Sequence, residues 1–434
     1  MDSPTSTAGP RRLLNKNFVL LWQGQFVSQL GSQAHAIAMM FWLKHATNSA
    51  SVMGMIMMLA MIPGVLLGPL GGTFADRYSR KRIIVWSDVV CGLAVLSLAT
   101  LMYVAPEAMD LTVVWMGTMA VIMGIVSAVF GPAIAASVPD LVPREKIAAA
   151  NSFSRSSSQI AGLIGQGIGG VLFRVLGAPA LFLIDGISYL LSAISESFIR
   201  IPQVIPERTQ GFRDVVRTFA RETAVGFRYI WERKGMRTLF FTAAFLNFFF
   251  SPFAVLLPFY IEDHLHATPD WFGYFLAAIG GGAMIGLAAA GAIKVSGRTR
   301  MIIVITLLVL DALSMASLGL ASAPVTALVI GFVIGVLNAY VNINIATILQ
   351  LTTPSQIRGR VFGVLGTISG GLMPIGMGLA GVVADLANQN IPAILLVCGF
   401  LVAVCTILVS FSREFRSFLA YEPGGAAEPT ISAG

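Results

Sequence analysis

The sequence predicts an all-α membrane protein with twelve transmembrane helices in two halves of six. The first observation is composition: 56% of the 434 residues are hydrophobic and 11% are charged, with a mean hydropathy of +0.81. A soluble domain is about 45–50% apolar and about 25% charged. The second observation is length, because this apolar content would fill about twelve helices of about 20 residues. A water-soluble enzyme, a disordered chain and a coiled coil are therefore excluded.

Apolar runs bounded by charged or turn residues mark the helices in chain order. In the first half they lie at 17–43, 51–75, 83–104, 111–134, 148–173 and 179–199. In the second half they lie at 237–261, 271–293, 301–321, 325–349, 360–385 and 391–411. Helices are expected because the alternation of barrel strands is absent and lipid leaves backbone groups no other partner.

The basic residues indicate the orientation of the chain. With the N-terminus inside, only Lys44 and Arg174 of the 28 Lys and Arg residues fall on the outer side. Because Lys and Arg concentrate in cytoplasmic loops, both termini are predicted to be cytoplasmic. The protein is thus expected to be a multi-pass membrane protein.

A basic segment separates the two halves. The predicted domains are an N-terminal tail (1–16), a six-helix half (17–199), a linker (200–236), a second six-helix half (237–412) and a C-terminal tail (413–434). The linker has apolar residues at three- to four-residue spacing beside an arginine stripe, which is typical of an amphipathic helix on an anionic membrane surface. A lipid-sensing role is one interpretation, and a simple tether is the other.

The loop after the second predicted helix carries a specific motif. It combines a glycine, an Asp-Arg pair and a basic pair: Gly72, Asp76, Arg77, Arg80 and Lys81. This order resembles the loop 2–3 signature of the major facilitator superfamily, with Ser79 in place of its usual second glycine. A carboxylate beside several cations can bind a neighbouring helix end and release it when the conformation changes. The motif therefore predicts a conformational switch, and the alternative is a plain basic loop.

Further stretches resemble the drug:proton antiporter branch that includes macrolide-efflux proteins and the enterobactin exporter. Examples are Pro63-Gly64, Phe130-Gly131-Pro132-Ala133 and Arg358-Gly359-Arg360. The resemblance covers nearly all of 15–412 and implies a major facilitator fold that works by alternating access. It implies multidrug efflux of amphiphilic small molecules, coupled to protons as an antiporter. The alternatives are an exporter or flippase of one siderophore, natural product or lipid, and a membrane enzyme or receptor on the same scaffold.

Two motifs depart from that branch. The fifth predicted helix carries an antiporter-like glycine motif, but Gln166 stands where a proline is usual; the glycines are Gly165, Gly167, Gly169 and Gly170. The fourth has no arginine, and Gln33 stands in the first where relatives often place an acidic residue. A proton site must therefore lie elsewhere, or the coupling is not to protons.

Ionisable residues within the predicted helices are the proton-coupling candidates, since such residues are costly in a bilayer and mark pathways. They are Asp185, His35, Asp88 and Asp311, with Glu196 near the inner end of the sixth helix. Asp185 is preferred because a desolvated carboxyl group can bind a proton within the physiological pH range. The alternatives are structural hydrogen bonding for Asp185 and His35, and pairing of Asp88 with Arg80 or Arg82. The resemblance places the helix of Asp311 at the periphery.

Neutral amides on the first, seventh and tenth predicted helices are the substrate-cavity candidates, because the resemblance implies that these helices line the cavity. They are Gln25, Gln29, Gln33, Asn247, Asn338 and Asn342. Amides among aromatic residues suit an amphiphilic substrate, and interhelical hydrogen bonding is the alternative.

The remaining expectations concern cofactors and partners. No Walker-type phosphate loop occurs, so a proton gradient rather than ATP is expected to supply the energy, with no other cofactor. His264 and His266 lie in a group that suits a hydrated loop better than a metal site. The expected partners are an amphiphilic small molecule, protons and membrane lipids, without nucleic acid, and the chain is expected to be a monomer.

Overall fold

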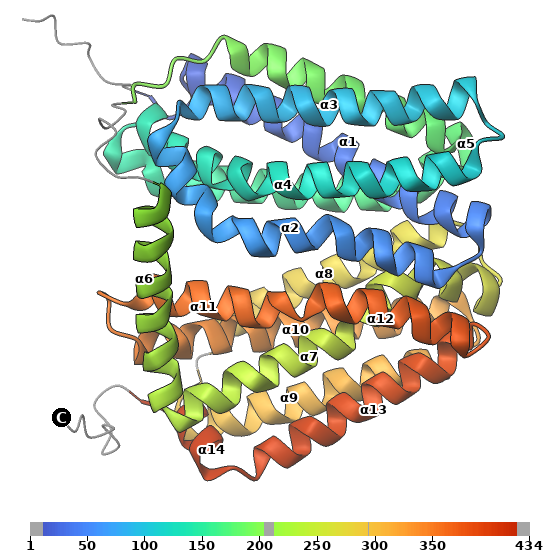
Figure 1. Ribbon diagram of the computed structural model, residues 1–434. Coiled ribbons are helices and arrows are strands. Elements are labelled where there is room, and N and C mark those ends of the chain that lie inside the picture. The colour runs from blue at the N-terminus through green and yellow to red at the C-terminus, as the bar shows by residue number, and fades with distance from the viewer. Residues whose placement is uncertain (1–11, 204–211, 294, 423–434) are drawn as a thin grey trace, which may run out of the picture. The chain divides into compact units, whose positions relative to one another are not determined.

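The computed structural model describes residues 12–203, 212–293 and 295–422. Long α-helices make up most of these residues (Figure 1). Parts of the predicted tails and linker, namely 1–11, 204–211 and 423–434, lie outside the described residues. The described chain folds into two compact units, which divide at Arg217 and Thr218, and the short segment Ser49–Gly54 belongs to the second unit. The predicted boundaries at 199 and 237 stay predictions.

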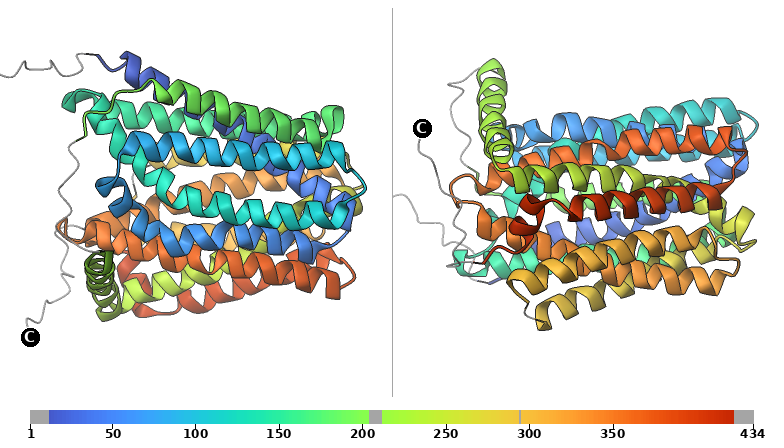
Figure 2. Two further views of the ribbon diagram at one scale, coloured as in Figure 1. Left: turned by 45° about the horizontal axis from the view of Figure 1, so that its top comes forward. Right: turned by 90° about the horizontal axis from the view of Figure 1, so that it is seen from below.

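The first unit contains helices α1 to α5. They are α1 (Lys16–Thr47), α2 (Ala50–Arg77), α3 (Arg80–Val104), α4 (Met109–Leu141) and α5 (Ile147–Ser197), with a 3₁₀ turn, η1 (Arg144–Lys146), before α5. The helices run alongside one another, as two further views of the chain show (Figure 2). α1 and α3 both pack against α5, and α3 also packs against α4. α5 therefore joins the unit together.

The second unit contains the helices from α7 onward and the later part of α6 (Phe212–Glu232). They are α7 (Lys234–Phe259), η2 (Tyr260–His264), α8 (Asp270–Ala292), α9 (Gly297–Leu318), α10 (Pro324–Thr352), α11 (Arg358–Gly371), α12 (Met373–Leu386), α13 (Ile391–Ser410) and α14 (Arg413–Leu419). The main packing pairs are α8 with α10, α9 with α13, and α7 with α12.

Each predicted transmembrane run is helical, but the boundaries differ from the prediction. Ten helical stretches of the described chain are long and apolar enough to cross a membrane. One of them contains all of α5, which covers two predicted helices and is interrupted at Gly177, where φ is 76°. α1 is not among the ten, because its amides lower its hydropathy. The count of twelve and the side of each terminus stay predictions.

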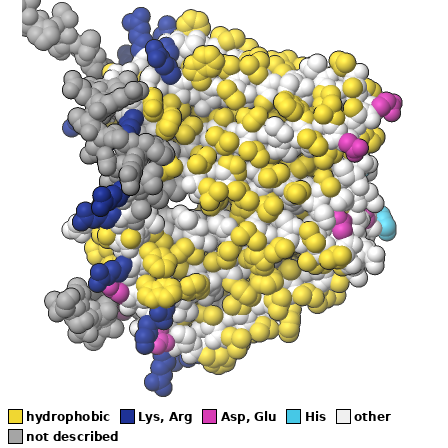
Figure 3. All heavy atoms as spheres, in the orientation of Figure 1, with side chains coloured by type: hydrophobic (Ala, Val, Ile, Leu, Met, Phe, Trp, Pro, Cys, Tyr) yellow, Lys and Arg dark blue, Asp and Glu magenta, His cyan; other side chains and the backbone are white. Residues whose placement is uncertain are grey.

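The exposed surface of the helices is apolar, as lipid contact requires. Figure 3 shows hydrophobic side chains along the lengths of the helices, with Lys and Arg gathered at helix ends. Leu66, Val114 and Phe400 are more than half exposed although they lie within apolar helices. Exposed apolar patches of this extent are rare on soluble monomers. The chain is therefore an all-α membrane protein.

Two glycines bring α1 close to the second half of α5. A Cβ atom on Gly24 would lie 2.8 Å from Ser192 Oγ. A Cβ atom on Gly31 would lie 2.6 Å from Ser188 Oγ and 2.7 Å from Asp185 Oδ1. Small residues allow helix backbones to approach in this way within membranes. The polar side chains of α5 therefore reach α1 directly.

Replacing Gly31 with leucine is expected to destabilise the first unit. The added side chain must displace Ser188 and Asp185 in a fully packed interface, and overpacking of this kind costs about 1–3 kcal/mol. Thermal unfolding in detergent measures the loss. Gly162→Leu on α5 is the matched control, because no described atom lies within 4 Å of its Cβ position. Equal melting temperatures for the two variants would contradict the packing argument.

The second unit shows two features that the sequence reading missed. The predicted C-terminal tail begins with α14, whose Phe415 and Leu419 are buried in a hydrophobic cluster with residues of α7, α9, α10 and α11. Asp385 near the end of α12 accepts hydrogen bonds from Ser49 Oγ at 2.7 Å and from the backbone N–H groups of Ala50 and Ser51. These bonds satisfy backbone donors at the N-terminus of α2, as a capping residue would.

Candidate transport site

Two polar stripes face each other where α1 packs on the second half of α5. On α1 the stripe consists of Gln25, Ser28, Ser32 and His35, and on α5 it consists of Asp185, Ser188, Tyr189, Ser192 and Glu196. Both sets recur every three to four residues, so each occupies one face of its helix. Most of these side chains are buried. The interface therefore contains a row of polar groups inside an apolar unit.

His35 and Asp185 form the centre of this row. His35 Nδ1 lies 3.0 Å from Asp185 Oδ2, and both side chains are buried. Ser32 Oγ lies 3.3 Å from Asp185 Oδ1 and 2.9 Å from Tyr189 Oη. The ring of His35 also packs against Phe182. Since a carboxylate beside a histidine can exchange a proton with the ring, the arrangement can hold and move a proton.

Asp88 and Glu196 lie together nearer the end of α5. Each carboxyl group is 1% exposed. The side chain of Asp88, from α3, is in hydrogen-bonding contact with Ser192 and Glu196. Glu196 Oε1 accepts a hydrogen bond from Gln25 Nε2 at 2.8 Å. The alternative pairing of Asp88 with Arg80 or Arg82 is therefore wrong, because α5 supplies its partners.

A pocket of about 70 Å³ lies beside this interface within the first unit. Its walls combine apolar and aromatic residues with neutral polar groups: Phe18, Leu21, Trp22, Gln25, Phe26, Gln29, Ile134, Val138, Ser154, Ser157 and Ser158. Trp22 Nε1 donates a hydrogen bond to Ser157 Oγ at 2.7 Å, which joins α1 to α5 across the lining. A few polar groups in a mostly apolar lining are typical of small-molecule sites.

Alanine at Gln29 is expected to weaken substrate binding between about twofold and tenfold. The amide lines the pocket, and the loss of one neutral hydrogen bond costs about 0.5–1.5 kcal/mol. Equilibrium binding of a fluorescent amphiphile to the purified protein measures the change. Gln23→Ala is the control, because Gln23 lies on the same helix but is exposed and bonded to Ser195. Unchanged affinity in Gln29→Ala would exclude a direct contact.

The two glutamines that depart from the antiporter pattern contact each other. Gln166 Nε2 donates a hydrogen bond to Gln33 Oε1 at 2.8 Å. A Cβ atom on Gly165 would lie 2.5 Å from Gln33 Cβ, and one on Gly169 would lie 2.5 Å from Ile37 Cδ1. Positions Gly162 and Gly167 are open. The glycine motif thus packs α5 on α1 along one face. The family resemblance implied an acidic residue at Gln33 and a proline at Gln166, and a neutral pair of hydrogen-bonded amides occupies these two positions.

In the second unit the candidates form a smaller group. Asp311 of α9 is buried, and its carboxyl group is in hydrogen-bonding contact with Asn338 of α10. Asn342 Nδ2 donates to Asn338 Oδ1 at 2.8 Å, and both amides are exposed within this unit. Asn247 is exposed on α7 and donates only to the backbone oxygen of Ala243 in its own helix. Asp311 therefore has an amide connection to the exposed face of α10.

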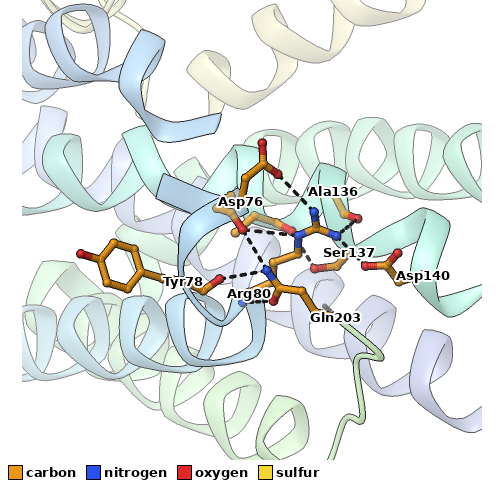
Figure 4. A network of polar contacts seen from close by, with 9 residues as sticks. Asp76, Tyr78, Arg80, Ala136, Ser137, Asp140 and Gln203 are labelled. Atoms are coloured by element: carbon orange, nitrogen blue, oxygen red, sulfur yellow. Dashed lines mark hydrogen bonds and ion pairs between the residues drawn. The ribbon is translucent and has the colours of Figure 1, made fainter. Parts of the chain in front are cut away.

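Arg80 lies at the centre of the predicted switch loop. Its guanidinium group donates to Asp140 and to the backbone oxygen of Ala136, both in α4, and to Asp76 at 3.2 Å (Figure 4). Its backbone N–H donates to Gln203 Oε1 at 2.9 Å. Asp76 is largely exposed, whereas Asp140 is half-buried. Gly72 has open space at its Cβ position. Arg77 is the last residue of α2, and Lys81 lies in the first turn of α3.

The structure brings some predicted residues together and separates others. His35, Asp185 and Asp88 belong to one polar interface, whereas Asp311 lies in the other unit. Sequence reading named Glu196 among the ionisable residues of the helices, but it did not include Asp140 or Gln203 among its candidates. The spacing of Asp185, Ser188, Ser192 and Glu196 on one helix face is the signal by which Glu196 could have been joined to the same polar stripe. His264, from the group considered for metal, contacts the backbone oxygen of Ala321.

A family model and two similar proteins of known function point to the same family. A family model described as Major Facilitator Superfamily matches residues 21–377. Macrolide efflux protein A of Streptococcus pyogenes is 26% identical over 92% of this chain and 96% of its own length. Multidrug efflux pump Tap of Mycobacterium tuberculosis is 24% identical over 89% of this chain and 92% of its own length.

Solved structures show the same fold. The nucleoside transporter NupG matches with a TM-score of 0.71 and 13% identity, covering 92% of this chain and 98% of that one. A bacterial homologue of the iron transporter ferroportin, in an inward-facing state, matches with a TM-score of 0.68 and 16% identity, covering 92% and 100%. At these identities the likeness concerns the fold alone.

Proposed function

The chain belongs to the Major Facilitator Superfamily, and on that premise we propose that it exports amphiphilic small molecules across the bacterial inner membrane in exchange for protons. Membership in this family supports a transporter rather than an enzyme. The similarity to macrolide and multidrug efflux proteins extends along almost the whole chain, and this supports drug efflux as the activity. We further propose that the protein acts as a monomer and that a proton gradient is its energy source.

The proposed substrate class rests on the lining of the pocket in the first unit. Phe18, Trp22 and Phe26 offer apolar area, and Gln25 and Gln29 offer neutral donors and acceptors. No charged residue lines this pocket among the described residues. Such a lining favours a molecule with a large apolar body and a few hydrogen-bonding groups over an ion or a phosphorylated metabolite. At about 70 Å³ the pocket is smaller than the about 300–1,000 Å³ of sites that hold a drug-sized molecule, so it offers a contact for part of a macrolide or lipophilic dye rather than for the whole molecule.

The proposed coupling of transport to protons rests on the contact between His35 and Asp185. A buried carboxylate and imidazole 3.0 Å apart form a unit that can take up and release a proton. The first helix supplies both His35 and the amides of the pocket. A movement of α1 caused by proton exchange would therefore also move the amides that contact the substrate. Such a link between the two sites is what exchange by alternating access requires.

Accumulation of several dyes distinguishes this proposal from its alternative. A strain that lacks the gene is expected to retain ethidium, rhodamine and erythromycin more strongly than the complemented strain. If retention of all three is unchanged and one secreted siderophore, natural product or lipid is lost, the exporter or flippase of a single compound is the correct function.

A further inference from the structure

Asp88 and Glu196 form a buried pair of carboxyl groups that the proposed function does not use. Asp88 Oδ2, Glu196 Oε2 and Ser192 Oγ are all inaccessible to solvent. The side chain of Asp88 contacts both Ser192 and Glu196, so the two carboxyl groups lie against each other. Two buried carboxyl groups in contact are costly when both are ionised, and a proton held between them removes this cost.

The surroundings of the pair supply no compensating positive charge. From α5 the facing titratable groups are Asp185, Tyr189 and the pair's own Glu196, and from α3 they are Asp88 and Cys91. From α1 the facing groups are the neutral Gln25 and Gly24. No Lys, Arg or His of the described residues forms an ion pair with either carboxyl group. Two carboxylates in contact in such a site cannot both be ionised, so the pair holds at least one proton and can take up a second.

Gln25 connects the pair to the pocket. Its amide nitrogen is bonded to Glu196, and the same side chain lines the pocket. With its N–H group engaged by an ionised Glu196, the amide has its carbonyl oxygen available to accept a hydrogen bond from a hydroxyl or ammonium group of a substrate. A protonated Glu196 no longer requires this donor and can itself donate to the amide oxygen, which then turns away from the pocket.

We propose that Asp88 and Glu196 form a proton-exchange site whose state is transmitted to the substrate pocket by Gln25. A substrate with a hydrogen-bond donor favours the state with one proton on the pair, and uptake of a second proton weakens substrate binding. Where the free pair holds two protons, substrate binding therefore releases one of them to solvent. This inference rests on the proposed function, because it gives the exchange of substrate for proton a location. It assigns Glu196 and Gln25 roles beyond the contact between His35 and Asp185.

Proton release on substrate binding tests the inference. Erythromycin is added to the full-length protein in lipid nanodiscs over a series of pH values, with weak buffer and pH indicator dyes. The wild type is expected to release up to one proton per bound molecule at the pH values where the free pair holds two, so that its affinity rises by up to about tenfold per pH unit in that range. Asp88→Asn with Glu196→Gln is expected to bind without release. Gln25→Ala is expected to bind with an affinity independent of pH.

The matched control is Glu107→Gln, because Glu107 is an exposed carboxylate of the same unit. Its proton release is expected to equal that of the wild type. Release by the double variant at the wild-type level would overturn the inference, and so would an unchanged pH dependence in Gln25→Ala. If the wild type does not bind erythromycin or any transported dye, the proposed function itself fails. The two failures are therefore distinguishable.

A second readout needs neither ligand nor the double variant. Infrared difference spectra in H₂O and D₂O detect the carbonyl stretch of a protonated carboxyl group. The wild type is expected to show this band, and Glu196→Gln is expected to alter it. A band that is identical in the wild type and Glu196→Gln would overturn the assignment of the proton to this pair.

Discussion

Asp185→Asn is expected to abolish export driven by a pH gradient, with a loss of at least about tenfold. The side chain is fully buried beside His35. Asparagine keeps the shape and can still bond to Ser32, but it cannot carry a proton in this pH range. Flux of a labelled macrolide from proteoliposomes with an imposed gradient measures the change. Exchange of labelled for unlabelled substrate without a gradient is expected to persist, because it needs no proton.

Two controls separate proton transfer from damage to the fold. Asp110→Asn changes an exposed carboxylate of the same unit and is expected to leave flux unchanged. Loss of both gradient-driven flux and exchange in Asp185→Asn would indicate a structural role only. Intact gradient-driven flux in this variant would contradict the assignment of Asp185 to proton coupling.

Arg80→Ala is expected to lower transport at least about tenfold and also to destabilise the protein. Arg80 joins the end of α2 to α4 through Asp140 and the backbone oxygen of Ala136. Hydrogen bonds to charged groups contribute about 1.5–3 kcal/mol each. Asp140 is half-buried, so most of the loss should come from this contact. Transport assays and thermal unfolding in detergent together measure both effects.

Asp76→Asn is the informative partner of that variant. Asp76 is two-thirds exposed in its contact with Arg80, and exposed ion pairs contribute at most about 1 kcal/mol. The melting temperature is therefore expected to change little, while transport falls if Asp76 acts as the releasable contact of a switch. Full transport activity in Asp76→Asn would contradict a switch role for this loop and leave the interpretation of a plain basic loop.

The arrangement of apolar segments in the sequence predicted most of the fold, because hydrophobic length and charge placement are local properties. The prediction was less accurate where a boundary depends on packing. α5 continues through Gly177 with a change of direction, and α14 forms where Phe415 and Leu419 find a hydrophobic cluster on other helices. Neither the turn at Gly177 nor the partners of Phe415 can be read from the surrounding residues.

The candidate site shows the same limit. The rarity of charge within apolar helices identified Asp185, His35 and Asp88 as residues of interest. Which of them meet depends on helix packing: the closeness of Gly24 and Gly31 to α5 brings the polar stripes together. Proximity in the sequence suggested that Asp88 would pair with Arg80. In the structure Arg80 turns to Asp140, and Glu196, 108 positions along the chain, is the partner of Asp88.

Transport in a defined system tests the central claim most directly. Purified protein is reconstituted into liposomes, and uptake or release of a labelled macrolide is followed with and without an imposed proton gradient. The account predicts accumulation against the macrolide gradient when protons flow in the opposite direction, and no accumulation when an ionophore removes the pH gradient. Accumulation that is unaffected by the ionophore, or absent under both conditions for every amphiphile that the protein binds, would contradict proton-coupled export.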